Sequence, residues 1–422
     1  MKKCLIVLVM LVGLLTLSFA QERSTLRGNL SVWSFTDEVE GLVNNYFVRA
    51  FPNVRINYSF TSYSENYESR LGSALASGRR APDVFALEAA DVRKYVESGL
   101  LLDLTDIYEA NRDRLLAYPV EIGTYNGRVY AMAWQACPGA FFYRRSIARR
   151  YFGSDDPVFV QNLVSNFDKF LETAERLRAA SNGQAVMLAS RGDLFNVFIN
   201  ARTQPWVVNN SLVIDPVMIR YMEISKIFNE KGYDAKVNQW GDGWFAAMRD
   251  ALPDARGRRY EAFGYFLPTW GLHYVLKPNA ESTSGDWAMV QGPAAYHWGG
   301  TWLAARRNTP NAAAAKEFIR YLTTDDNFLE EYALASGDIV SSIPVMNRIA
   351  PIFSEPYLRG QNHYAAFSAI AQNANGRTLQ STDQVINSIF GEVVFSYVLG
   401  EMTLDQALAD FRAQVQRQLR IR

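Results

Sequence analysis

The chain has 422 residues, of which 49% are hydrophobic and 20% charged, so it is long enough for two or three domains and too apolar to be largely disordered. Its 43 basic and 43 acidic residues balance, which excludes the positive field expected of a nucleic-acid-binding protein. Three scattered histidines and two cysteines are too few for the usual zinc sites. We therefore expect neither a nucleic-acid partner nor a bound metal.

Residues 1–20 have the layout of a secretory signal peptide. A basic start precedes an apolar run at 5–17, and small residues precede Gln21. The run is shorter than the about 20 residues that a membrane-spanning helix needs, so cleavage after Ala20 is favoured over an uncleaved anchor. Gln21 stands where a lipoprotein would carry its cysteine. We therefore expect an unlipidated periplasmic protein whose remaining cysteine, Cys137, is buried and forms no internal disulfide.

Strands and helices alternate over the first hundred residues. Alternating apolar residues predict strands at 30–32 and 54–60, and an apolar run predicts a buried strand at 84–87. Residues with helical spacing lie between and after these strands, at 39–50, 64–77 and 91–98. This β-α-β-α-β-α order predicts a mostly parallel sheet covered by helices.

Several polar residues have the spacing of helix caps. Asp37 with Glu40, and Thr403 with Gln406, have the spacing of capping boxes, in which a side chain at each end of a four-residue segment bonds the backbone of the other. Asn311 precedes an alanine-rich helical pattern and is predicted to cap that helix as well.

No sequence motif indicates catalysis or a cofactor. Glycine-rich phosphate-binding loops, the H-E-x-x-H zinc motif and the G-x-S-x-G nucleophile motif do not occur in the sequence. The middle of the chain, about 155–260, has helical patterns, and no long linker or fixed-period repeat interrupts the chain. This organisation favours two lobes between which the chain crosses more than once. Binding is therefore favoured over catalysis, with no cofactor.

Five short motifs occur in one order along the chain: Leu30-Ser-Val-Trp-Ser34, Ala81-Pro-Asp-Val-Phe85, Glu97-Ser-Gly-Leu-Leu-Leu-Asp-Leu-Thr105, Asn126-Gly-Arg-Val-Tyr-Ala131 and Ala315-Lys-Glu-Phe-Ile319. Together they resemble motifs of the family 1 extracellular solute-binding proteins. These are the sugar-binding components of ABC importers and include maltose-binding protein. The chain departs from the family pattern at Met132-Ala133, where an apolar residue and proline are usual, and at Arg144, where asparagine is common.

The resemblance implies an α/β, two-lobed periplasmic binding protein fold (type II), with mixed sheets flanked by helices and a cleft between the lobes. It places the N-terminal lobe at 25–132 plus 303–336 and the C-terminal lobe at 138–297 plus 345–422. Crossovers are expected near 132–137, 297–302 and 336–345. Hinge closure around a ligand is expected of this fold.

Ligand-binding residues are expected beyond the carboxyl ends of strands, where ligands bind in open α/β sheets. After the first predicted strand these are Thr36, Asp37 and Glu38, and after the third they are Glu88 and Asp91. Asp37 and Asp91 are also suitable helix caps, and Glu38 suits the first turn of a helix. Both interpretations stay open on the sequence alone.

The other expected ligand residues are of two kinds: flat aromatic rings, which pack on the C–H faces of a polyol, and side chains with paired polar groups, which bond its hydroxyls. The first crossover supplies Trp134 and Gln135, although Trp134 could instead belong to the core. The further candidates are Arg191 and Asp193, which follow an apolar run at 185–189, and the rings of Trp270 and Trp298. Three other rings are more readily explained as core or surface cover: Trp206, Trp240 and Trp244.

The predicted function is that of a periplasmic binding protein, without enzyme activity, that delivers a sugar or oligosaccharide to the transmembrane subunits of an ABC permease. It is expected to act as a monomer. The alternative within this class is a non-sugar solute, such as a phosphorylated polyol, a peptide or a polyamine bound by Glu38, Glu88 and Asp91. The alternative outside it is a secreted carbohydrate-active enzyme. A sensory ectodomain is disfavoured because no further apolar run approaches membrane-spanning length.

Overall fold

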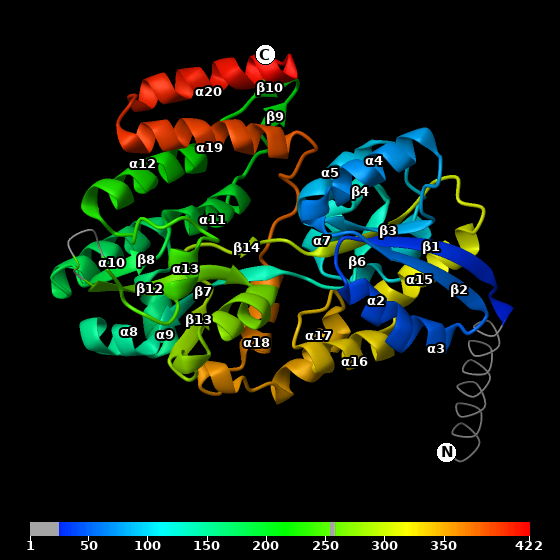
Figure 1. Cartoon of the computed structure of the whole chain (residues 1–422), viewed down its shortest axis with the longest axis horizontal. Helices are drawn as coiled ribbons and strands as arrows, with labels where there is room; N and C mark the ends of the chain where they lie inside the picture. The colour runs from blue at the N-terminus through cyan, green and yellow to red at the C-terminus, as the bar shows by residue number, and fades with distance from the viewer. Residues whose placement is uncertain (1–24, 254–256, 258) are drawn as a thin grey trace, which may run out of the picture. The chain divides into compact units, whose positions relative to one another are not determined.

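The computed structural model describes residues 25–253, 257 and 259–422 (Figure 1). The chain forms two compact units, each assembled from three separate segments. Over the described residues, unit 1 comprises 25–113, Gly123–Trp134 and Thr301–Glu331, and unit 2 comprises Arg114–Ile122, the described part of 135–300, and Tyr332–Arg422. The predicted signal peptide at 1–20 lies outside the described residues. Among the described helices, none combines the length and apolar character needed to cross a membrane.

Unit 1 contains a five-stranded sheet in the order β2-β1-β3-β15-β6. β1 (Gly28–Ser34), β2 (Val54–Phe60) and β3 (Val84–Glu88) are parallel, as the sequence patterns predict. β15 (Thr301–Ala305) is antiparallel to both β3 and β6 (Ala131–Ala133). The sheet predicted as mostly parallel is therefore mixed, because the chain re-enters the unit at Thr301 and adds a strand of opposite direction.

Helices cover both faces of this sheet (Figure 1). On one face, α4 (Tyr67–Ser77) packs beside α5 (Ala89–Glu97), where Tyr95 Oη donates to Glu68 Oε1 at 3.0 Å. On the other face, the rings of Phe47 and Phe318 lie 4.7 Å apart and join the first helical segment to α15 (Ala312–Thr324). That first segment comprises α2 (Glu38–Leu42), a π-helical turn (Val43–Phe47) and α3 (Val48–Ala50). The remaining elements are α6 (Thr105–Glu109), the hairpin of β4 (Thr124–Tyr125) and β5 (Arg128–Val129), and α16 (Asp326–Ser336), which crosses the unit boundary.

Unit 2 contains a sheet built around the antiparallel pair β7 (Pro138–Arg144) and β12 (Arg259–Pro268). β13 (Trp287–Val290) and β14 (Tyr296–His297) pair with β7, whereas β11 (Leu252–Pro253) and β8 (Ala185–Leu188) pair with β12. Only β8 is parallel to its partner, so this sheet is mixed too. Close packing requires a glycine in β7, because a Cβ at Gly139 would lie 2.0 Å from the Tyr296 ring.

The helices of unit 2 pack on this sheet through a core rich in aromatic rings, in which Trp206 lies within 5.5 Å of the rings of both Phe390 and Phe411. α12, α19 and α20 form a helical layer at one end of the unit (Figure 1). The helices are α7 (Ala117–Ile122), α8 (Arg145–Phe152), α9 (Pro157–Leu163), α10 (Phe167–Ala180), α11 (Leu194–Asn200), α12 (Pro216–Lys231), α13 (Asp242–Ala246), α14 (Lys277–Asn279), α17 (Ile343–Ile349), α18 (His363–Ala371), α19 (Asp383–Leu399) and α20 (Leu404–Leu419). The small hairpin of β9 (Val207–Val208) and β10 (Ser211–Leu212) completes the unit.

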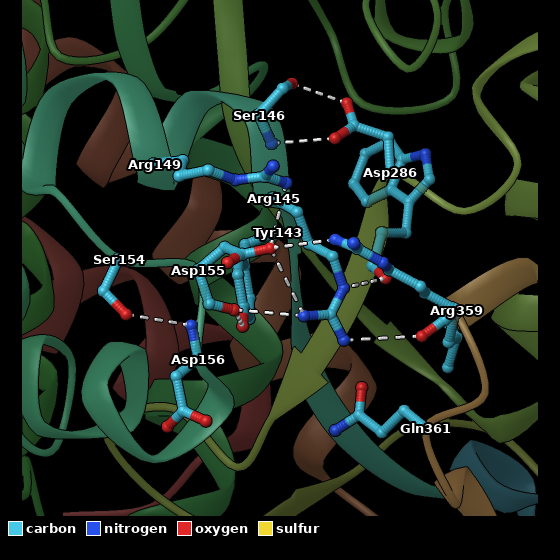
Figure 2. A network of polar contacts seen from close by, with 12 residues as sticks. Tyr143, Arg145, Ser146, Arg149, Ser154, Asp155, Asp156, Asp286, Arg359 and Gln361 are labelled. Atoms are coloured by element: carbon cyan, nitrogen blue, oxygen red, sulfur yellow. Dashed lines mark hydrogen bonds and ion pairs between the residues drawn. The ribbon is translucent and has the colours of Figure 1, made fainter.

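A buried arginine ties β13 and two loops of unit 2 to the start of α8 (Figure 2). Arg145 is 8% exposed, and its guanidinium donates to the carbonyl oxygens of Trp287, Asp155 and Leu358 at 3.0, 3.1 and 3.4 Å. The Asp155 carboxylate also accepts from Arg149 at 3.0 Å. Because a buried guanidinium is tolerated only when its N–H groups are satisfied, these bonds fix the positions of the loops around it.

Cys137 is buried, as predicted, with 1% of its surface exposed. Its N–H donates to Tyr118 Oη at 2.6 Å, and its carbonyl accepts from Trp298 N–H at 3.0 Å. Its thiol donates to Gln135 Oε1 at 3.7 Å. The residue is therefore a packed part of the unit 2 interior.

Two predicted helix caps are wrong and one prediction is confirmed. Asp37 and Asn311 precede their helices, but neither side chain makes a cap hydrogen bond. Asn311 Nδ2 instead donates to the Asn29 carbonyl at 3.0 Å and ties α15 to β1. A capping side chain requires an extended backbone at its own position, and neither residue has one. Thr403 and Gln406 do form the predicted capping box at the start of α20.

Candidate functional site

The carboxyl ends of β1 and β3 lie at one edge of the unit 1 sheet because the two strands are parallel neighbours. We call the residues there the acidic edge: Thr36, Asp37, Glu38, Glu88 and Asp91. After β1, the Thr36 carbonyl accepts from Ser34 Oγ at 2.7 Å and from Tyr58 Oη at 2.8 Å. Thr36 Oγ1 accepts from the Glu38 N–H at 3.3 Å. The turn is therefore held by its own polar groups, and the Asp37 side chain is exposed.

Glu88 and Asp91 are both engaged by protein groups. Glu88, and not Asp91, caps α5, because its Oε2 accepts from Ala90 N–H at 2.7 Å. Burial raises the pKa of Glu88 to about 7, although the Ala90 N–H opposes the rise and the negative charge of Asp91 adds to it. Asp91 is 4% exposed and accepts from Tyr63 Oη at 2.8 Å. Glu88 therefore gains or loses a proton near neutral pH, and its protonated form can donate a hydrogen bond.

Trp134 and Gln135 lie on either side of the boundary between the units in the sequence. Trp134 has no exposed surface and Gln135 is 6% exposed. In this structure Trp134 is a core residue, which was the alternative left open by the sequence. A ligand contact from either residue stays a prediction.

Three indole rings of unit 2 gather at a partly exposed surface, which we call the tryptophan surface: Trp240, Trp270 and Trp298. Trp240 and Trp270 are nearly parallel, with ring planes 13° apart and centroids separated by 6.2 Å. The Trp298 ring is inclined to both, at 64° to Trp240 and 66° to Trp270. Trp240 is the most exposed of the three tryptophans, with 44% of its surface accessible to solvent.

The backbone around these rings is unusual. Trp270 precedes a π-helical turn (Gly271–Leu276), and its Nε1 donates to the Trp298 carbonyl at 3.0 Å. Gly299 has a φ of +71°, and a Cβ there would lie 3.0 Å from Trp270 Nε1. Trp240 has a φ of +68°, a conformation that costs a bulky residue of order 1–3 kcal/mol. Strain of this kind persists where the surroundings impose it and is concentrated at functional sites.

Asp193 imposes part of that geometry from inside unit 2. It has no exposed surface, and its Oδ1 accepts from Gln239 Nε2 at 2.9 Å and from Trp244 Nε1 at 3.1 Å. Trp244 is itself buried and packs against Trp240 at 5.0 Å. Burial raises the pKa of Asp193 well above its usual range, although the bonds from Trp244 and Gln239 oppose the rise. Asp193 therefore anchors the residues on both sides of Trp240, and a direct ligand contact from its carboxylate stays a prediction.

Arg191 lies two residues before this anchor and remains partly accessible. Its Nη1 pairs with Asp234 Oδ2 at 3.1 Å, and its side chain is 23% exposed. The Asp234 side chain is 1% exposed, and burial raises its pKa although Arg191 opposes the rise. Arg191 thus presents a cation whose partner carboxylate is out of solvent.

The structure brings the predicted candidates Trp270 and Trp298 together with Trp240, which the sequence interpretation ranked as core or surface cover, and a ligand contact from any of the three stays a prediction. A usable signal was present, because Trp240 stands in the turn-forming segment Asn238-Gln239-Trp240-Gly241-Asp242. A large ring between turn residues seldom belongs to a core. In the described part of the chain, no three His, Cys, Asp or Glu side chains gather closely enough to hold a metal ion.

A family model described as bacterial extracellular solute-binding protein matches residues 33–327. The chain belongs to this family. The resemblance inferred from the short motifs is therefore confirmed. The matched residues of this solute-binding protein include the acidic edge and the whole tryptophan surface.

Solved structures share the fold of this solute-binding protein over nearly its whole length. A family 1 extracellular solute-binding protein superposes with a TM-score of 0.81 at 20% identity, covering 92% of this chain and 99% of that one. MalE of Xanthomonas citri has a TM-score of 0.74 at 14% identity, covering 92% and 96%. The GacH receptor of Streptomyces glaucescens, solved unliganded and with acarbose, has a TM-score of 0.69 at 17% identity, covering 94% and 99%. These likenesses confirm the predicted α/β, two-lobed fold with mixed sheets.

A curated relative is the arabinooligosaccharide-binding protein of Bacillus subtilis (strain 168), which is 23% identical over 164 residues. The match covers 36% of this solute-binding protein and 37% of the relative. It therefore spans little more than a third of either chain.

Proposed function

We propose that this protein binds a sugar or oligosaccharide on the tryptophan surface and serves as the substrate-binding component of an ABC transporter. The observation that carries the proposal is the gathering of Trp240, Trp270 and Trp298 at a partly exposed surface. A folded protein usually buries such rings, but here Trp240 has a strained backbone, and the buried Asp193 carboxylate bonds its neighbours Gln239 and Trp244.

The chemistry of this surface suits a carbohydrate. The flat C–H face of a sugar ring packs against an aromatic face, while its hydroxyls need polar partners at the rim. Rings inclined at 64° and 66° present faces in two directions and so can contact more than one sugar unit. This arrangement favours an oligosaccharide. It is consistent with family relatives that bind arabinooligosaccharide and acarbose by name.

The proposal extends to the steps that family membership implies. The protein is exported to the periplasm after cleavage following Ala20, acts as a monomer and closes on its ligand by a hinge motion. The ligand shifts the open–closed equilibrium only by its differential affinity for the two states. The loaded protein then delivers its ligand to the transmembrane subunits of an ABC permease, without catalysis.

A thermal-shift screen of residues 21–422 tests the proposal, using mono- and oligosaccharides, polyols and polyamines. A ligand at 100 times its Kd stabilises the native state by about 2.7 kcal/mol, which moves the melting midpoint by a few degrees. We expect oligosaccharides to give the largest shifts. Shifts confined to polyamines would instead favour a binding role for the acidic edge.

Calorimetric titration of the best sugar then locates the site. Trp270→Ala is expected to weaken binding about 30-fold or more, because truncating a central aromatic contact typically costs about 2 kcal/mol or more. Tyr274→Ala is the matched control, since it removes a ring that is 66% exposed from the same π-helical turn and should leave the affinity unchanged. Unchanged affinity in Trp270→Ala would overturn the assignment.

A further inference from the structure

Unit 2 also contains a cavity whose lining residues differ from those of the tryptophan surface. It has a volume of about 400 Å³ and lies between α12, α19 and the loops at 190–192 and 236–239. We call it the α12–α19 pocket. No tryptophan lines it, so it is distinct from the tryptophan surface although Gln239 at its wall precedes Trp240.

The charged side chains that line the α12–α19 pocket are both cationic: Arg191 and Lys236. The Asp234 carboxylate pairs with Arg191 and also interacts electrostatically with Lys236, but its side chain is 1% exposed and so faces away from solvent. Lys236 is exposed, and its Nζ forms no ion pair or hydrogen bond with the described residues. The wall therefore offers positive charge that its own neighbours leave only partly neutralised.

Two residues of the pocket wall are locally unfavourable choices. Lys236 has a φ of +56°, which glycine or asparagine adopts more readily than lysine. Gly391 lies in the middle of α19, where glycine weakens a helix relative to alanine. Nothing lies within 4 Å of the position that a Gly391 Cβ would occupy, so packing does not require glycine there. Both residues lower local stability. Gly391 leaves the α19 wall of the pocket open, and the conformation at position 236 accompanies an exposed lysine side chain.

The remaining walls fit the rest of a sugar. The Asn238 side chain has no hydrogen-bond partner among the described residues, so its amide can bond hydroxyl groups. Asn229 and Gln239 already donate from their amide nitrogens, to the Val398 carbonyl and to Asp193, and offer their amide oxygens as acceptors. On the α19 side, the Phe395 ring lines the pocket with 58% of its surface exposed. A half-exposed ring next to amides and cations combines the three kinds of contact that a sugar acid offers: C–H faces, hydroxyls and an anion.

We propose that the α12–α19 pocket is a second binding site that takes an acidic sugar, with its carboxylate or phosphate placed between Arg191 and Lys236. The anion is either a free sugar acid or sugar phosphate, or the acidic unit of a longer carbohydrate. This proposal does not rest on the function assigned to the tryptophan surface, because the two sites share no lining residue.

Calorimetric titration with glucuronate and glucose 6-phosphate, each compared with glucose, tests the proposal on residues 21–422. We expect the acidic sugars to bind at least about tenfold more tightly than glucose, with an affinity that falls as salt rises. Gly391→Leu should fill the pocket and abolish this preference without unfolding α19, because leucine is a good helix former. Ser388→Leu is the matched control, since this exposed residue of the same helix does not line the pocket.

Lys236→Asn tests the contribution of the lysine charge to binding separately from the conformation of its loop. Asparagine tolerates a positive φ, so the loop should keep its conformation while the affinity for acidic sugars drops about fivefold. Trp270→Ala should leave acidic-sugar binding intact, which distinguishes this site from the tryptophan surface. Equal affinity for acidic and neutral sugars would overturn the proposal. So would a loss of acidic-sugar binding in Trp270→Ala together with its retention in Gly391→Leu.

Discussion

The acidic edge of unit 1 and the tryptophan surface of unit 2 were both expected to bind ligand, but they are constructed in opposite ways. At the acidic edge the polar groups are the candidates, and the protein already engages several of them, as Glu88 accepts from Ala90 N–H and Asp91 from Tyr63 Oη. At the tryptophan surface the polar group is buried and the rings are presented. A polar residue after a strand can therefore stabilise the fold, as Asp193 does, while neighbouring aromatic rings form the surface that is exposed to a ligand.

Removing the buried anchor should have the largest effect. Asp193→Ala leaves Gln239 Nε2 and Trp244 Nε1 without their acceptor and is expected to lower the free energy of unfolding by about 2–3 kcal/mol. Sugar affinity should fall with it, because Trp240 loses its support. Denaturant unfolding and calorimetry measure the two effects. Asp242→Ala, an exposed substitution close to the same loop, is the control and should change stability by less than about 0.5 kcal/mol.

At the acidic edge, Glu88 should make the free energy of unfolding rise as the pH is lowered. The pKa of Glu88 is raised to about 7 in the folded state, so the native protein holds a proton that the unfolded chain releases above its ordinary pKa of 4.5. The stability that this carboxyl contributes is therefore present at low pH and is lost as the pH rises through 7. Between pH 8 and pH 5 the gain should be roughly 2 kcal/mol in the wild type and absent in Glu88→Gln. Equal pH slopes in the two proteins would show that Glu88 is not held in this protonation state.

A histidine of unit 2 should respond to acid with the opposite sign and a slightly smaller effect. Burial lowers the pKa of His297 to about 4, while the unfolded chain takes up its proton near 6.5, so stability is lost as the pH falls below 6.5. By pH 5 the expected loss is about 1–2 kcal/mol. His297→Phe keeps a ring stacked on Tyr118, 5.0 Å away, and should remove this part of the loss. Urea unfolding at pH 7 and pH 5 makes the comparison, and an unchanged acid loss in the variant would contradict it.

Local sequence pattern was sufficient for the parallel strands and for the capping box at Thr403, because periodicity and cap spacing depend on neighbouring residues. It failed at Asp37 and Asn311, where the backbone conformation of the preceding turn decides whether a side chain can cap. The mixed character of the unit 1 sheet depends on where the chain returns at Thr301, which no local pattern records.

The candidate site was less accessible to sequence reasoning than the fold. Trp240, Trp270 and Trp298 are about thirty residues apart in the sequence, and their meeting depends on how β12 and the segments around it pack. The position after a predicted strand nominated Asp193 as a ligand residue, which stays a prediction. That position could not show that the Asp193 carboxylate is turned inward to Trp244.

The burial of Cys137 has a practical consequence for measuring ligand binding by fluorescence. A chain of residues 21–422 has this one cysteine, and with 1% of its surface exposed it should be protected from maleimide reagents. A cysteine introduced at an exposed position such as Tyr274 would then be labelled selectively, in the π-helical turn that follows Trp270. An environment-sensitive dye attached there would convert the protein into a reagentless fluorescent sensor for its own ligand.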